Sequence, residues 1–100
     1  MLFRSSVPAE IWQLTSLTEL DLYNNQLTSV PAEIGQLILL TYLNLGKNQL
    51  TSVPAEIGQL ISLRVLYLDR NQLTSMPAAI REVRAAGCYV RLDAGVTFDE

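Results

Sequence analysis

Four tyrosines stand at alternate positions of short leucine-rich segments, and charged or amide residues occupy or directly follow the equivalent positions. The tyrosines are Tyr23, Tyr42, Tyr67 and Tyr89. The polar residues are Glu19, Asp21, Asn44, Lys47, Asp69, Arg70 and Arg91. Tyrosine and arginine combine a large contact area with a polar tip, and they often anchor protein interfaces. The chemistry that this set suggests is noncovalent recognition of a protein or peptide.

Catalytic chemistry has little support in the sequence. Histidine is absent, which removes Ser-His-Asp and Cys-His arrangements and the usual zinc-ligand spacings. Asp21, Asp69 and Asp93 suggest an acid pair or a cation site, but they are scattered over an open sheet with no evident pocket. Cys88 has no neighbour in the sequence that would lower its pKa. We therefore expect no enzymatic activity, no metal and no cofactor.

Composition narrows the choice of partners. The chain has 100 residues, of which 49% are hydrophobic, enough for one small domain with a continuous core. Seven lysines and arginines and a net charge of −3 give no basic stripe, so we expect neither nucleic acid nor an anionic membrane as a partner. The single cysteine excludes a disulfide within the chain, and residues 1–6 are too short for a secretory signal. We predict a soluble, intracellular protein.

The candidate residues belong to a repeated segment with a 23-residue period. The most similar stretches are residues 17–25, 40–48 and 63–71, and Gln-Leu-Thr-Ser follows each of them. A fixed period of this length is typical of a solenoid. The pattern L-x-x-L-x-L-x-x-N-x-L over residues 7–92 resembles the leucine-rich repeat family, in particular its 23-residue class of intracellular Ras-group-type and some bacterial proteins.

The resemblance implies an α/β fold, namely a leucine-rich repeat solenoid. In this fold a right-handed superhelix places short parallel strands on a concave face and short helical or 3-10 segments on a convex face. The concave face is the family's usual protein-binding surface, and the resemblance carries that expectation to the tyrosine positions. Extracellular members generally have cysteine-rich caps, and this chain has none.

The repeat boundaries divide the chain into three parts. We predict an N-terminal half-repeat without its strand, three full repeats and a C-terminal capping strand and turn, at residues 1–16, 17–39, 40–62, 63–85 and 86–100 respectively. The strands of the repeats should cover residues 19–23, 42–46 and 65–69. A capping strand at residues 88–92 requires one inserted residue, so that Val90 and Leu92 face the core.

Differences between repeats gather near the strands. Residues 17–39 and 40–62 differ at five positions, and four of these lie in or beside the strand, on the side that the leucines do not use. We interpret this face as a recognition surface. The alternative is that the tyrosines only stabilise the sheet, because tyrosine is a good strand former. The projected patch is about 240 Å², against about 800 Å² per partner in a standard interface.

Two further groups have predicted roles. Asn25, Asn48 and Asn71 follow the strands, where an amide can pair with the backbone of neighbouring coils in a structural ladder. The N-terminal half-repeat exposes an edge for self-association, for example as a homodimer, through Ile11, Trp12 and Leu14. A short or truncated array that associates through this edge is the alternative to a binding module. A competing arrangement folds residues 1–3 over the edge as a cap.

Overall fold

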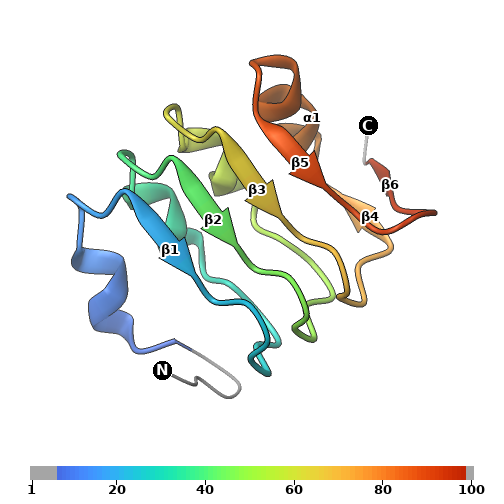
Figure 1. Ribbon diagram of the computed structural model, residues 1–100, viewed down its shortest axis with the longest axis horizontal. Helices are drawn as coiled ribbons and strands as arrows, with labels where there is room; N and C mark the ends of the chain where they lie inside the picture. The colour runs from blue at the N-terminus through green and yellow to red at the C-terminus, as the bar shows by residue number, and fades with distance from the viewer. Residues whose placement is uncertain (1–6, 99–100) are drawn as a thin grey trace.

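A computed structural model describes residues 7–98 of the chain (Figure 1). Four strands form a parallel sheet in the order β1-β2-β3-β5. Their bounds are β1 (Glu19–Asp21), β2 (Tyr42–Asn44), β3 (Val65–Tyr67) and β5 (Tyr89–Arg91). Figure 1 shows them side by side on one face, with helical segments behind. Each coil thus contributes one strand, as the 23-residue period predicts.

The strands are three residues long, shorter than the five-residue strands predicted from the pattern. Just beyond two of them a strand side chain bonds to the backbone: the Tyr23 amide donates to Asp21 Oδ1 at 3.0 Å, and the Gly46 amide donates to Asn44 Oδ1 at 3.0 Å. Asx turns of this kind compete with the strand ladder. The residue that follows is left-handed in all three repeats, with φ between 55° and 61° at Asn24, Lys47 and Arg70.

Within residues 7–98, the convex side consists of three 3-10 helices and one α-helix. These are η1 (Ala9–Gln13), η2 (Ala32–Gln36), η3 (Ala55–Gln59) and α1 (Ala78–Ala85). A proline precedes each of them, in a place where its missing donor costs nothing. α1 has no glycine at the position that Gly35 takes in η2 and Gly58 takes in η3, and it contains good helix formers. Both features fit an α-helix that is longer than the 3-10 helices. Gly87, with φ of 110°, follows its end.

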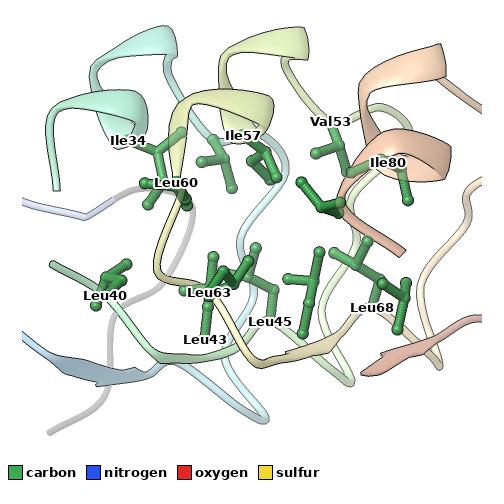
Figure 2. Close-up of a cluster of buried hydrophobic side chains, with 14 of the residues drawn as sticks. Ile34, Leu40, Leu43, Leu45, Val53, Ile57, Leu60, Leu63, Leu68 and Ile80 are labelled. Carbon is green, nitrogen blue, oxygen red and sulfur yellow. The ribbon is translucent and has the colours of Figure 1, made fainter. Parts of the chain in front are cut away.

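The core lies between the sheet and the convex segments (Figure 2). Leucines of the strands point up from the sheet, and Ile34, Ile57 and Ile80 point down from η2, η3 and α1. Leu43, Leu45 and these isoleucines have no exposed surface. Burial of one such side chain contributes roughly 1.5–3 kcal/mol. Because each coil supplies the same side chains, stacking makes one continuous core.

The C-terminal coil has the one-residue insertion that the pattern requires. Leu43 pairs with Leu66, one full period later. Leu66 pairs with Val90, one position beyond the next full period. Val90 is consequently buried, and Leu92 is half-buried. The chain then turns and forms β6 (Thr97–Phe98), which pairs in parallel with β4 (Ser75–Met76), and this second, two-stranded sheet was not predicted from the sequence.

The N-terminal half-coil differs from its prediction at one residue. Trp12 takes the repeat position of Gly35 and Gly58 and was assigned to an exposed edge, but its side chain is only 4% exposed. At Gly35 an added Cβ would lie 2.6 Å from Gln59 Oε1, so η2 and η3 approach closely there. The packing of η1 against η2 is looser, and the indole is buried in the core. The predicted cap of residues 1–3 lies outside the described residues.

Candidate functional site: the concave strand surface

Side chains at alternate strand positions form the concave strand surface. It comprises Glu19, Asp21, Tyr23, Tyr42, Asn44, Tyr67, Asp69, Tyr89 and Arg91, and Lys47 and Arg70 flank it just beyond the strand ends. Between these positions the strand residues Leu43, Leu66 and Val90 are buried, because successive side chains point to opposite faces of a sheet. The register therefore brings the predicted recognition residues together on one side of the molecule.

Three tyrosines from three adjacent strands form a continuous row. The ring centroids of Tyr42 and Tyr67 are 5.9 Å apart and those of Tyr67 and Tyr89 are 6.1 Å apart, both in edge-to-face geometry. The row runs in a zigzag across the sheet, because the strand register pairs Tyr67 with Asn44 on one side and with Arg91 on the other. Asn44 Nδ2 also donates to the Tyr42 hydroxyl at 3.2 Å. These contacts hold the row in one arrangement.

Tyr23 stands apart from this row and lies beside Gly46 on the neighbouring strand segment. A Cβ at Gly46 would be 3.2 Å from Tyr23 Cδ1 and 3.1 Å from Asn44 Oδ1. Gly46 is buried, so the space that the missing side chain leaves is occupied and does not form an open notch. The glycine lets the Tyr23 ring approach the backbone of the second repeat, and the ring itself stays 42% exposed.

A hollow of about 190 Å³ lies between Tyr23 and the tyrosine row. Its lining residues are Tyr23, Asn44, Tyr67, Asp69, Arg70 and Arg91. Inside it, Arg91 Nε lies 3.9 Å from Asp69 Oδ2. Because the Arg91 side chain is 60% exposed, this ion pair adds little to stability. The hollow therefore offers two guanidinium groups, one carboxylate and two aromatic rings to a ligand.

Asp93 has a role that the sequence did not reveal. In the first two repeats, the amides of Asn24 and Lys47 donate to the carbonyls of Gly46 and Asp69 on the next coil, each at 3.0 Å. At the last coil the carboxylate of Asp93 replaces that carbonyl and accepts from the Arg70 amide at 2.9 and 3.0 Å. It also accepts from the Asn71 amide at 3.4 Å. Asp93 is a structural cap, so it does not belong to an acid pair.

The three asparagines after the strands bond to the backbone of their own and neighbouring coils. Asn48 Nδ2 donates to the carbonyls of Leu22 and Leu45 at 3.0 Å, and its Oδ1 accepts from the Leu27 amide at 3.1 Å. Asn71 repeats this pattern one coil later, and Asn25 donates to the Leu22 carbonyl at 2.9 Å. Their amides are thus used inside the fold and are not offered to a partner.

Cys88 lies directly before β5 and is buried. Burial raises the pKa of its thiol, because the thiolate would lose hydration. A raised pKa lowers the reactive thiolate fraction at neutral pH. Cys88 therefore fills space in the core of the last coil.

The predicted self-association edge is only partly exposed. The Leu14 side chain is 49% exposed, Ile11 is half-buried, and Trp12 is buried as described above. A shallow depression of about 460 Å³ is lined by residues 13–17 beside them. Among the described strands, β1 pairs on one side only, with β2. Leu14 is consequently the main apolar contact that this edge presents.

Within residues 7–98, no helix has the length and apolar character that crossing a membrane requires.

Comparison with known proteins identifies the repeats. A leucine-rich repeat family model matches residues 15–73. Among solved structures, the chain is similar to a leucine-rich repeat protein of Leptospira interrogans, with 40% sequence identity and a TM-score of 0.77. That similarity covers 89% of this chain and 24% of the other. The comparison with curated proteins gives no match.

These matches and the parallel sheet backed by short helical segments confirm the predicted solenoid fold. Proteins of this kind generally act as protein-interaction modules and are typically not enzymes. The family model covers more than half of the chain, and the chain accordingly belongs to the leucine-rich repeat family.

Proposed function

We propose that the concave strand surface binds a protein or peptide partner, with the tyrosine row at the centre of the contact. The observation that carries the proposal is the row itself: Tyr42, Tyr67 and Tyr89 present large amphipathic rings that are already fixed by edge-to-face contacts. Rigid aromatic side chains lose little conformational entropy when a partner docks on them. They are well suited to serve as interface anchors.

Exposure argues against a purely structural role for the tyrosines. Tyr89 is 57% exposed, so more than half of its surface remains in water. The core leucines of these strands, Leu43 and Leu66, point to the opposite face of the sheet and are fully buried there. Cross-strand aromatic contacts stabilise the sheet to some extent. They do not explain why four of the five differences between residues 17–39 and 40–62 lie in or beside the strand.

The size of the surface limits the partner. Three strand spacings span about 14 Å, and a strand of three residues adds about 10 Å in the other direction. A standard interface buries about 800 Å² per partner, which is several times this area. The hollow of about 190 Å³ is also smaller than the 300–1,000 Å³ of typical small-molecule pockets. The surface fits a short extended segment of a partner better than an enclosed small ligand.

The proposal is tested with the variant Tyr42→Ser/Tyr67→Ser and a displayed library of random 12-residue peptides. We expect the intact chain to enrich peptides that the variant does not retain. The variant Tyr42→Phe/Tyr67→Phe keeps the ring contacts and should retain much of the binding. Enriched peptides that bind the serine variant equally well would place the site elsewhere.

A second candidate function is self-association through the N-terminal edge. Leu14 is 49% exposed, whereas Leu37 and Leu60 at the same repeat position are buried. Burial of such a side chain in a contact contributes roughly 1.5–3 kcal/mol. Sedimentation of the chain at about 100 µM tests this candidate, with Leu14→Lys expected to shift any dimer towards monomer. A monomer at that concentration would rule it out.

The intracellular location predicted from the sequence stays a proposal. Fractionation of cells that produce the protein tests it.

A further inference from the structure

On the concave strand surface, β1 carries only carboxylates, whereas the arginines lie on β5 and just after β3, together with Asp69. Glu19 and Asp21 are both exposed on β1, at one side of the sheet. Within residues 7–98 neither carboxylate takes part in an ion pair, and the contact of Asp21 is with the Tyr23 amide. This side of the surface therefore carries two negative charges that are open to a ligand.

The two arginines that line the hollow carry the other sign. Arg70 and Arg91 line the hollow together with a single carboxylate, that of Asp69. Asp69 already lies 3.9 Å from Arg91 Nε, and the nearby Asp93 is engaged by backbone amides. Two guanidinium groups and one carboxylate line the hollow, so the lining itself carries an excess of positive charge. The tyrosine row crosses the sheet between β2 and β5, next to both charged sides.

We propose that the concave strand surface selects an extended peptide segment of bipolar charge, with a basic residue over Glu19 and Asp21 and an acidic residue over the Arg70–Arg91 hollow. This inference rests on the proposed function and specifies its ligand. The partner is named by its chemistry: opposite charges at the two ends and apolar or aromatic residues between them. Such residues pack on the tyrosine rings.

The strand spacing sets the distance between the carboxylates on β1 and Arg91 on β5. The distance from β1 to β5 is three strand spacings, about 14 Å. An extended chain rises about 3.3 Å per residue. A segment that crosses the strands therefore reaches from one charged side to the other in about four residues. Basic and acidic residues at positions i and about i+4 of the ligand satisfy both ends at once.

Complementary charge at the rim of a contact gives specificity and faster association more than affinity. An exposed ion pair contributes about 0.2–1 kcal/mol and weakens as salt screens it. The bipolar requirement should therefore appear as sequence selection and salt dependence. Contacts with the tyrosine row should be much less sensitive to salt.

Two variants change the charge of one side each. Glu19→Lys/Asp21→Asn turns the negative side positive, and the asparagine retains the turn because Asn44 makes the same contact with Gly46 in the second repeat. Arg70→Glu gives the hollow an excess of negative charge, and the Arg70 amide can still donate to Asp93. Combining the two variants inverts the polarity of the whole surface. Glu33→Lys on the exposed convex side is the matched control.

The experiment uses the intact chain and a displayed library of random 12-residue peptides, counter-selected on Tyr42→Ser/Tyr67→Ser. Selected peptides should share a basic and an acidic residue about four positions apart. For such a peptide we expect each one-sided variant to weaken binding about five- to ten-fold at low salt. The combined variant should bind within about twofold of the original protein, because the peptide can lie in the reverse direction. Glu33→Lys should bind normally.

Two other outcomes separate this inference from the proposed function. Peptides that require Tyr42 and Tyr67 but lack the charge pattern, or that ignore both one-sided variants, would overturn the bipolar ligand and leave the binding surface standing. A library from which no peptide depends on the tyrosines would overturn both. Circular dichroism of each variant checks that loss of binding is not loss of fold.

Discussion

Residues 25–38 and 48–61 are identical in sequence, whereas the eight residues before each of them, 17–24 and 40–47, differ at four positions. The identical stretches contain an asparagine of the ladder, buried apolar residues and a convex 3-10 helix. The differing residues lie on the concave strand surface or directly follow it. Two neighbouring coils thus share one framework and present two different faces.

The contacts explain this contrast. Framework side chains face the same neighbours in every coil: Asn48 and Asn71 make equivalent hydrogen bonds one period apart, and the leucines pack on their own counterparts. A change at such a position would disturb two interfaces at once. On the concave strand surface a side chain contacts a few neighbours and water, so it can vary without loss of the fold. Five predictions test this division between framework and surface.

The largest effect should come from the core. Leu43→Ala removes a fully buried side chain and should lower the free energy of unfolding by about 2–5 kcal/mol, through lost burial and the cavity left behind. Urea denaturation measures the change. Ile61→Ala is the control, because Ile61 is 84% exposed and its loss should cost under about 0.5 kcal/mol. Equal losses for the two variants would contradict the assignment of Leu43 to the framework.

The ladder should come next. Asn48→Ala leaves the Leu27 amide without its acceptor and removes one of the two amide donors from each of the Leu22 and Leu45 carbonyls, which should cost about 1–3 kcal/mol. The midpoint of urea denaturation reports the loss. Glu56→Ala on the convex side serves as the comparison and should change stability by less than about 0.5 kcal/mol. An unchanged midpoint for Asn48→Ala would mean that water replaces the amide without cost.

Loss of the cap of the last coil should have an effect of intermediate size on stability. Asp93→Ala removes the acceptor for the Arg70 and Asn71 amides and should cost about 1–2 kcal/mol. Asp93→Asn keeps one oxygen acceptor and should lose less. Hydrogen exchange of the Arg70 amide shows the effect locally. Protection that survives in Asp93→Ala would show that Asp93 is dispensable as a cap.

Cys88 gives a smaller, pH-dependent effect. Burial raises the pKa of its thiol in the folded chain above the unfolded value of about 8.5. The resulting stability is fully present below that unfolded pKa and is lost as the pH rises towards the folded pKa, because the unfolded thiol ionises first. As the pH rises from about 7.5 to 9.5, the free energy of unfolding should therefore fall more for the original protein than for the Cys88→Ala variant. If stability falls equally with pH in the original protein and in Cys88→Ala, the thiol is not buried in its neutral form.

The smallest effect concerns the backbone beyond the strand. Lys47 adopts φ of 55°, a left-handed conformation that asparagine tolerates better than lysine. Asn24 already occupies this place in the first repeat. Lys47→Asn should raise the free energy of unfolding by up to about 0.5–1 kcal/mol. A lower denaturation midpoint would show that the Lys47 side chain makes a stabilising contact.

Much of the framework could be predicted from the period alone. The spacing of the leucines predicts the strands and their register, and the apolar pattern of residues 88–92 predicts the single insertion before Val90. Strand length was not predictable in this way, because the period does not show that the chain turns through a left-handed residue soon after each of the first three strands, at Asn24, Lys47 and Arg70. The pairing of β4 with β6 depends on a turn after the last repeat, which the period does not describe.

The candidate site also has features that the repeat pattern does not predict. Strand alternation places the tyrosines on one face, but it does not reveal that the Tyr23 ring covers Gly46. Asp93 was noticed only as a nearby acid, because a carboxylate that replaces a backbone carbonyl leaves no mark in the repeat pattern. Burial of Trp12 depends on the looser packing of η1. Each of these outcomes comes from contacts between coils at positions where the repeat is irregular.

The most direct test of the division between framework and surface compares two variants of similar stability. Tyr42→Ser/Tyr67→Ser breaks two aromatic contacts and should cost about 1–3 kcal/mol, close to the loss expected for Asn48→Ala. Both are assayed, at a temperature where both are folded, for binding of one peptide selected on the intact chain. We predict that Asn48→Ala binds within about twofold of the original protein and that the tyrosine variant binds more than about tenfold more weakly. Equal weakening in both variants, or full binding by the tyrosine variant, would contradict the account.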